Sequence, residues 1–474
     1  MKRFCVIILC MVVALNTVGC TGNFNKENAL KDIKFPSKPP VDKLYDSEIT
    51  GDSTKWGELG THDPSIFKDG DTYYVFSTDA RVGGAPTPGI QVRKSKDLIN
   101  WDYIGVAFDK GVPSIAAAWA NATGLWAPDV TRIGDNYYLY YAASSFGSNK
   151  SFIGVATSKA IEGPWVDQGE VIKTDTGDTM NAIDPNIVYD EQGDMWLSYG
   201  SFWSGIYVLK MDKATGKPAE AGKGKNISRR NSSVSGAVEG PYITYNTTYK
   251  KYYLFVSYGS LSSDYNVRVG RSDKVDGPYL DSQGNDMTNT TVEPNQVGNK
   301  IMGGYKFGDT EGWIAPGHNS VLKDGKDFYI VHHIRAVTDS SWFYMNVRKI
   351  LWSKDGWPMV SPEKYAGDKE QKIDKAVIPG QWDKIILSNA YNDQISSDNL
   401  KLLPNGKVEG DAKSNWKFSG NNILSLSLYD DKENKASEFN CKVIAAWDAE
   451  NNKPNLVFTG MDDKGTSICG KMVK

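Results

Sequence analysis

The stretch His62–Asp79, HDPSIFKDGDTYYVFSTD, decides the fold, because four further copies of its pattern follow along the chain. Each copy opens with a polar residue beside a proline or a small residue. A short apolar strand follows, then a turn of Gly, Asp or Asn, then a strand rich in Tyr, Trp and Phe. The other copies are APDVTRIGDNYYLYYAAS (127–144), DPNIVYDEQGDMWLSYGS (184–201), EGPYITYNTTYKKYYLFVS (239–257) and GHNSVLKDGKDFYIVHH (317–333). Repeated strand–turn–strand units of this size predict the blades of a β-propeller.

The second half of each repeat supplies further alternating strands, as in IGVATSKAIEGPWVDQG (153–169), so each blade reaches about four strands. We therefore predict an all-β chain with a five-bladed β-propeller over residues 51–365. Short alternating strands then predict a small C-terminal β domain, a barrel or a sandwich, over 366–474. We interpret that domain as a packing module rather than a carbohydrate-binding one, because its aromatic residues are sparse. Asn285–Ile314 lacks a strong pattern and is expected to form a long loop over one face of the propeller.

The composition and the N-terminus limit the location and the partners. The formal net charge of -3 offers no basic footprint, which argues against nucleic acid as a partner. Residues 1–20 have a basic start, a short apolar run and a final cysteine, as in a secretory signal. The ending TVGC resembles a bacterial lipobox, with Cys20 as the lipidated first residue and 21–50 as a polar tether and lead-in. We expect a monomer in the bacterial cell envelope that contacts the membrane only through this lipid anchor.

Outside the signal, the cysteines are Cys441 and Cys469. They could pair in an oxidising compartment, but sequence separation alone does not decide whether they do. The chain has no CxxC motif and no His/Cys cluster, so the sequence gives no support for a zinc site.

The first strand of a propeller blade lines the central axis, so the leading residues of the five copies should converge at one end of it. They are Asp63, Asp129, Asp184, Glu239 and His318. Acids that cap a turn before a proline are common, but three acids at equivalent repeat positions favour catalysis. Hydrolysis of a glycosidic bond needs one charged carboxylate to activate water and one protonated carboxyl group to protonate the leaving oxygen. A third carboxylate would raise the pKa of the acid.

These motifs together resemble glycoside hydrolase family 43, from about Thr61 to Pro362. The resemblance rests on HDPS, LWAPDV, AIDPN with WLSYGSF, VEGPY and APGHNS. It implies that Asp63 is the general base, that Glu239 is the general acid, and that Asp184 tunes and orients the acid. It also implies inversion of configuration, with roughly 6.5–9.5 Å between base and acid to admit a water.

Within that family the sequence is most similar to the endo-acting α-1,5-L-arabinanases, through the motifs GLWAPDV and YYAASSFGSNKSFIGVATS (140–158). The resemblance implies endo-hydrolysis of arabinan during the breakdown of plant cell walls. Trp126 and Phe146 would then stack on sugars, with packing inside a blade as the alternative. The other expected substrate-binding residues are Asp129, Asn186, Ser201 and Phe202. His318 would help to hold a hydrated calcium ion in the central channel, whereas His332 and His333 are interpreted as packing or network residues.

Three other functions remain open from sequence. An exo-acting α-L-arabinofuranosidase or β-xylosidase would have the same fold, and the insertions 109–121 and 285–314 decide between a groove and a pocket. A non-catalytic surface glycan-binding protein is disfavoured, because all three acids are present. Sucrose- and fructan-cleaving propellers are disfavoured because their WMNDPNG and RDP signatures are absent.

Overall fold

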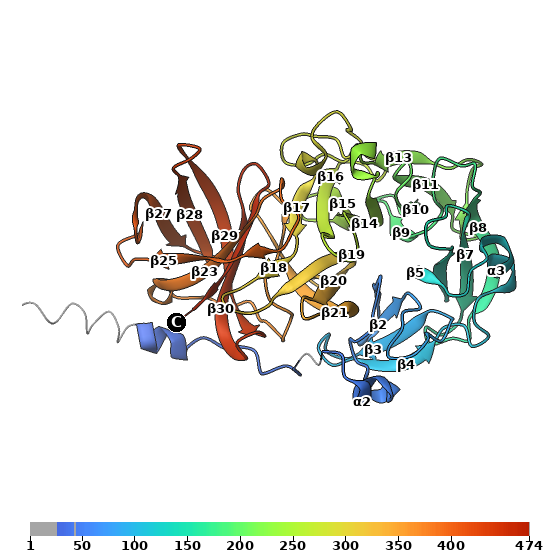
Figure 1. The fold of residues 1–474 in the computed structure, drawn as a ribbon, viewed down its shortest axis with the longest axis horizontal. Coiled ribbons are helices and arrows are strands. Elements are labelled where there is room, and N and C mark those ends of the chain that lie inside the picture. Colours follow the sequence, from blue (N-terminus) through green and yellow to red (C-terminus); the bar gives the residue numbers. More distant parts are fainter. Residues whose placement is uncertain (1–25, 42–43, 474) are drawn as a thin grey trace, which may run out of the picture.

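The computed structural model describes residues 26–41 and 44–473, and Figure 1 shows two β domains side by side. The larger is a propeller of five blades around a central axis. The smaller is a closed β-barrel, coloured orange to red. The predicted all-β class, the five-bladed propeller and the small C-terminal β domain are confirmed, and that β domain is a barrel. In the described part of the chain, none of the helices has the length and apolar character needed to cross a membrane.

Blades 1 and 2 are four-stranded antiparallel meanders that begin at the axis. Blade 1 comprises β1 (Ser65–Asp69), β2 (Thr72–Ser77), β3 (Gln91–Ser95) and β4 (Asp102–Val106). Blade 2 comprises β5 (Trp126–Ile133), β6 (Asn136–Ala143), β7 (Ser151–Ser158) and β8 (Val166–Thr174). The loop between the two blades carries the short helix α3 (Ser114–Ala120).

Blades 3 to 5 repeat the plan with irregular outer strands. Blade 3 comprises β9 (Asn186–Tyr189), β10 (Met195–Tyr199), β11 (Ile206–Asp212), β12 (Lys217–Pro218) and β13 (Lys225–Ser228). Blade 4 comprises β14 (Val238–Asn246), β15 (Lys251–Tyr258), β16 (Asn266–Ser272) and β17 (Asn299–Met302). Blade 5 comprises β19 (Trp313–Asp324), β20 (Asp327–Ala336), β21 (Asp339–Trp352) and β22 (Pro358–Val360), with β18 (Tyr305–Lys306) and β24 (Ile395–Ser396) at its edge.

The segment 285–314 differs from the predicted loop. It contains β17, which is the outermost strand of blade 4, and β18, which extends the sheet of blade 5. Before β17, Leu280 forms only a pair of isolated bridges, to Arg271 and Asp286. All four residues of β17, including Asn299 and Lys300, are buried. The strand is short, half polar and preceded by an Asn/Thr-rich stretch, so its sequence has no strand-like alternation.

Apolar clusters fill every junction between neighbouring blades. One of them packs Phe76 of blade 1 against Leu139 of blade 2, and equivalent clusters join blades 2 and 3, 3 and 4, and 4 and 5. The ring closes where Val75 of blade 1 packs with Val331 of blade 5. Burial of this apolar surface holds the blades together and so fixes the leading residues around the axis.

The chain before blade 1 adds a second closure. Leu59 forms an antiparallel bridge with Tyr344 of β21, and the amide of Gly60 donates to the carbonyl of Phe343. The short helix α2 (Ser47–Thr50) precedes this segment. The residues directly before the first leading residue are therefore tied to the last blade.

The second domain is a closed antiparallel barrel of eight strands. The interior is filled by buried side chains, among them Trp382, Trp416 and Phe458. Cys441 and Cys469 are free thiols on the two strands that flank β30, so they do not form a disulfide. The strands are β23 (Gly380–Leu387), β25 (Asp398–Leu402), β26 (Lys407–Val408), β27 (Asp411–Ser419), β28 (Ile423–Asp430), β29 (Lys435–Asp448), β30 (Lys453–Met461) and β31 (Ser467–Met472).

Part of the expected polar tether packs against the barrel. Residues 26–31 are helical, and Ile33 is buried in the barrel core with Leu30 and Phe35 beside it. The backbone of Lys34 exchanges two hydrogen bonds with the Gln371 side chain, at 2.8 and 2.7 Å. Three apolar residues within six positions explain the difference, because a solvated tether would leave them exposed. The signal segment and Cys20 lie outside the described residues.

Candidate active site

The same backbone geometry occurs where the chain reaches the central axis at the start of each blade. A residue with left-handed backbone angles directly precedes a proline at the start of every blade, and we call it the entry residue. The five entry residues, with their φ angles, are Asp63 (51°), Ala127 (34°), Asp184 (59°), Gly240 (59°) and Ala315 (54°). Such angles are uncommon for residues other than glycine and gather at functional sites. Asp63 and Asp184 are therefore structurally equivalent.

Two predicted acids do not share that position, which corrects the expectation that the acids are equivalent. Glu239 lies one residue before its entry residue, whereas Asp129 lies two residues after its own. The one-residue offset turns a side chain to the other face of a strand. The register of β14 against β15 is also interrupted between Glu239 and Tyr242. The repeat in the sequence locates the blades but not this offset.

Asp129 belongs to a buried ring of hydrogen bonds that ties the blades together. Its carboxylate accepts from the Ser65 hydroxyl and from the Ile187 amide, both at 2.7 Å, and from the Asn186 side chain at 3.3 Å. Asn186 in turn accepts from the amide of Ile243 at 2.8 Å. Burial raises the pKa of Asp129 to about 6, against the effect of these donors. The structure thus gives Asp129 and Asn186 partners within the protein.

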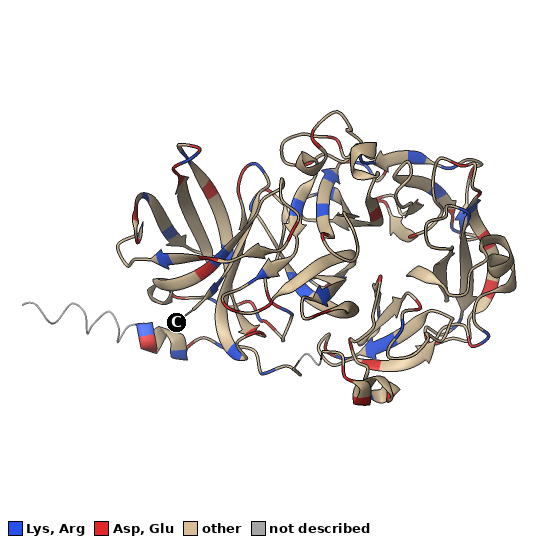
Figure 2. Cartoon of the chain, viewed as in Figure 1, with Lys and Arg blue, Asp and Glu red and all other residues tan. Residues whose placement is uncertain are grey.

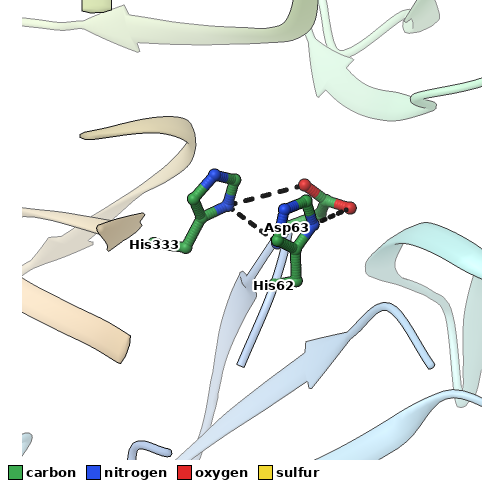
Figure 3. Close-up of side chains that lie close together, drawn as sticks. All are labelled: His62, Asp63 and His333. Atoms are coloured by element: carbon green, nitrogen blue, oxygen red, sulfur yellow. Dashed lines mark hydrogen bonds and ion pairs between the residues drawn. The ribbon is translucent and has the colours of Figure 1, made fainter. Parts of the chain in front are cut away.

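Asp63 lies among three imidazoles, two of which, those of His62 and His333, are drawn with it in Figure 3. Nδ1 of His62 is 2.8 Å from one carboxylate oxygen, and Nδ1 of His318 is 2.9 Å from the other. His333 is 3.6 Å away and accepts the Asp63 amide, while the Thr78 hydroxyl donates at 2.6 Å. Burial alone would raise the pKa of Asp63, but His318 and His62 hold it well below its usual range. The carboxylate therefore stays charged.

Asp184 has the opposite electrostatics. Burial raises its pKa to about 7, and the charges of Glu239 and Asp63 act in the same direction, while His318 opposes them. One of its oxygens accepts the amide of Gly240 at 3.0 Å. That amide directly follows Glu239, so Asp184 is attached to the backbone beside the expected acid.

Glu239 accepts one hydroxyl on each carboxyl oxygen. Ser201 donates to Oε2 and Tyr265 donates to Oε1, both at 2.8 Å. Ser201 was expected from the sequence to bind substrate, whereas Tyr265 was not expected at the site. Tyr265 lies between β15 and β16, outside the repeated leading positions, and no pattern in the sequence identifies it.

The aromatic residues expected at the substrate site differ in exposure. Phe146, in the loop after β6, is 89% exposed, whereas Trp126 and Phe202 are half-buried. Trp203 follows Phe202, is 41% exposed, and was not expected from sequence. Both residues have left-handed backbone angles, with φ of 51° and 40°. The structure therefore presents two exposed rings, those of Phe146 and Trp203, that packing inside a blade does not account for.

The donors around the axis match the needs of a calcium ion only in part. Potential ligand atoms of His62, Asp63 and His333 lie within 4.8 Å of one another, but two imidazoles and one carboxylate do not match the oxygen-rich set that calcium prefers. Nδ1 of His318 bonds to Asp63, and Nε2 has no hydrogen bond to another described residue. The neighbouring Asn319 has a buried side-chain oxygen without a partner in the described part of the chain. These residues fit an ion that one imidazole nitrogen holds and water otherwise surrounds.

Without a bound ion, His318 carries a proton at neutral pH. Burial lowers its pKa, but the carboxylates of Asp63, Asp184 and Glu239 outweigh that effect and raise it to about 9. A proton and a cation would therefore compete for His318, since a metal-bound imidazole must be neutral. His332 and His333 are fully buried, and burial lowers the pKa of both, to about 3 for His332.

Lysine, arginine and acidic residues are mixed over both domains (Figure 2), which agrees with the small net charge. The three carboxyl groups at the axis are thus a local concentration of acid and not part of an acidic surface. The surroundings lower the pKa of Asp63 and raise that of Asp184. The site thus holds one charged carboxylate and one carboxyl group that can bind a proton, as acid–base chemistry at a sugar bond requires.

Comparison with known proteins agrees with this site. Residues 58–358 match the family model for glycosyl hydrolases family 43, and residues 362–470 match a C-terminal lipocalin-like domain. The chain is 32% identical to an extracellular endo-alpha-(1->5)-L-arabinanase of Thermotoga petrophila, over 87% of this chain and 93% of that protein. An extracellular exo-alpha-(1->5)-L-arabinofuranosidase of Cellvibrio japonicus is 35% identical over 67% of this chain and 90% of its own.

Solved structures give the same picture. The crystal structure of an endo-1,5-alpha-L-arabinanase from Thermotoga petrophila has a TM-score of 0.79 at 30% identity, covering 88% of this chain and 99% of its own. An alpha-L-arabinanase of Cellvibrio cellulosa, complexed with arabinohexaose, has a TM-score of 0.56 at 33% identity over 64% of this chain and 96% of its own. This chain therefore belongs to family 43 of the glycosyl hydrolases and is a glycoside hydrolase.

Proposed function

We propose that this protein hydrolyses internal α-1,5-L-arabinofuranosidic bonds of arabinan with inversion of configuration. The observation that carries the proposal is the division of labour at the axis: Asp63 is held charged, whereas Asp184 binds a proton near neutral pH beside Glu239. Endo action is favoured over exo action because two relatives that match 87% of this chain, from Thermotoga petrophila and Bacillus subtilis, are both named extracellular endo-alpha-(1->5)-L-arabinanases. Exo action on arabinofuranosides or xylosides remains the alternative.

The proposed reaction is a single displacement. Asp63 accepts a proton from water as the water oxygen bonds to the anomeric carbon. The glycosidic bond breaks at the same carbon, and the leaving oxygen takes a proton from Glu239. Asp184 holds the backbone beside Glu239 and, when charged, opposes loss of the acid's proton. Phe146 and Trp203 offer exposed rings on which sugars could stack.

Product analysis tests the proposal directly. Wild-type enzyme is incubated with linear arabinan, and the products are separated by chromatography over time. Mixed oligosaccharides at early times support endo action, whereas arabinose alone supports the exo alternative. The anomeric form of the first product, followed by NMR, tests inversion. An intact polymer would refute arabinan hydrolysis.

Glu239→Gln tests the acid. Help from a general acid is worth about 10²–10⁴-fold, and it matters most when the leaving group is a sugar alkoxide. The variant should lose that factor on arabinan and much less on an arabino-oligosaccharide that releases 4-nitrophenol, because this phenol leaves without a proton. Equal losses on both substrates would move the acid's role to another residue.

We also propose a hydrated calcium ion at Nε2 of His318. When bound, the ion would add positive charge beside the ionised carboxylates. Prolonged chelation should lower activity or Tm, and added calcium should restore it. His318→Ala should lower both and make them insensitive to chelation. Unchanged kinetics and melting after chelation would leave His318 as the hydrogen-bonding partner of Asp63.

Two expectations about location remain proposals. The names of its relatives, which are called extracellular, support export. A lipid anchor on Cys20 would then hold the exported enzyme in the cell envelope as a monomer. Radiolabelled palmitate should enter the wild-type protein and not Cys20→Ala.

A further inference from the structure

Tyr265 joins the expected acid and the expected base through one stack of rings. The phenol donates to Oε1 of Glu239 at 2.8 Å. Its ring stacks on His333, with centroids 5.7 Å apart and planes within 11° of parallel. His333 in turn stacks on His62 at 4.0 Å, and His62 bonds to Asp63. A continuous series of contacts therefore links Glu239 to Asp63 through Tyr265 and two histidines.

The ring of Tyr265 has no freedom to leave this position. The residue is 1% exposed, and it packs over Gly317 of β19. A Cβ atom at Gly317 would lie 2.0 Å from Cδ1 of Tyr265, so a side chain there would displace the ring. Gly317, the glycine of the GHNS motif, therefore leaves the space that the Tyr265 ring occupies beside His318.

The hydroxyl contact should strengthen during the reaction. Glu239 begins protonated and becomes a carboxylate as it gives its proton to the leaving oxygen. A carboxylate accepts stronger hydrogen bonds than a neutral acid does. Burial raises the pKa of Tyr265 well above its usual value, so the phenol keeps its proton and remains a donor throughout. An interaction that is stronger in the transition state than in the ground state accelerates the chemical step.

We propose that Tyr265 is a positioning residue for the general acid, which fixes Oε1 of Glu239 and stabilises the carboxylate that forms as the leaving oxygen is protonated. The proposal rests on the proposed role of Glu239. Ser201 does the equivalent on Oε2. Tyr265 acts through Glu239 and needs no contact with the sugar.

The test compares Tyr265→Phe with Tyr279→Phe. Both remove one hydroxyl from a fully buried tyrosine of blade 4, but Tyr279 donates to the carbonyl of Val275 at 2.7 Å, away from the acid. Each variant and the wild type are assayed for kcat and KM on linear arabinan and on an arabino-oligosaccharide that releases 4-nitrophenol. Tm is measured for all three.

Tyr265→Phe should lower kcat on arabinan by roughly 10–100-fold, the effect of one hydrogen bond to a charged group, and leave KM within about twofold. The loss on the nitrophenyl substrate should be under about threefold, because that leaving group needs no acid. Tyr279→Phe should retain wild-type kinetics on both.

Equal losses of Tyr265→Phe on the two substrates, or an unchanged kcat with a lowered Tm, would overturn the proposal and leave Tyr265 as a packing residue. Failure of the proposed function is distinguishable from this. If wild-type enzyme leaves arabinan intact, or if Glu239→Gln loses activity equally on both substrates, Glu239 is not the acid. The proposed role of Tyr265 is then excluded as well, whatever the result for Tyr265→Phe.

Discussion

At the scale of single residues, the surroundings of Asp63 keep it in the charged form that a general base needs. Two imidazoles and the hydroxyl of Thr78 bond to its oxygens, and they keep the carboxylate charged. Asp63→Ala should therefore lower kcat on arabinan by about 10²–10⁴-fold or more. Asp135→Ala, in an exposed turn of blade 2, is the control and should retain full activity. Azide should partly rescue Asp63→Ala and give the inverted glycosyl azide; near-wild-type activity without azide would show that Asp63 is not the base.

Asp184 predicts a specific shift in the pH profile. Burial raises its pKa to about 7 and the charge of Glu239 acts in the same direction, so the two carboxyl groups oppose each other's ionisation. In Asp184→Asn this repulsion is gone, so Glu239 should ionise at a lower pH. The alkaline limb of kcat/KM against pH should then move downward.

Asp368→Asn is a matched control for that experiment. Burial raises the pKa of Asp368 to about 7 as well, but the residue lies in the connector to the barrel, outside the cup. Its variant should keep the wild-type limb. An alkaline limb that stays in place in Asp184→Asn, or that moves upward, would rule out Asp184 as the neighbour that tunes the acid.

At the scale of elements, the entry residue of each blade directs the side chains around the axis. Gly240 shows how little space is available, since a Cβ atom there would lie 3.0 Å from Cγ of His318. Gly70 has nearly the same φ, 58° against 59°, but a Cβ atom there would meet nothing within 4 Å. Alanine at either position should cost about 1–2 kcal/mol of backbone strain. Only Gly240→Ala should also displace His318, and so lower kcat/KM well beyond the change in Gly70→Ala. Similar activities in the two variants, at similar Tm, would show that the close approach is unimportant.

The same elements show what the sequence could predict. Five copies of one pattern were enough for five blades, because alternation and turn chemistry are local properties. The convergence of Asp63, Asp184, Glu239 and His318 followed from the architecture. The one-residue offset of Glu239 did not, because it depends on an irregular register between β14 and β15. Tyr265 reaches the acid from a non-repeated loop, and only the three-dimensional packing over Gly317 reveals it.

At the scale of the whole molecule, a buried ion cluster ties the barrel to the propeller. Lys471 of β31 forms ion pairs with Glu363, which follows the propeller, and with Glu450. Asp448 lies 3.5 Å from the same ammonium group. Burial raises the pKa of Glu363 to about 8, although Lys471 opposes this. The ammonium group is therefore what allows three carboxyl groups to share a dry interface.

Lys471→Met tests this cluster. Removal of one partner from a buried ion pair typically costs about 3–5 kcal/mol, because the remaining charges are left without compensation. The loss should depend on pH in a definite direction. A carboxyl group with a raised folded-state pKa contributes stability that is complete below its unfolded pKa and is lost as pH rises through the folded one. The drop in Tm should accordingly be larger at pH 8 than at pH 5, where Glu363 is protonated. Lys413→Met, which breaks an exposed 3.2 Å pair with Asp431, should change Tm little at either pH. A pH-independent loss in Lys471→Met would show that the loss comes from Asp448, whose lowered pKa keeps it charged at both pH values, and not from ionisation of Glu363.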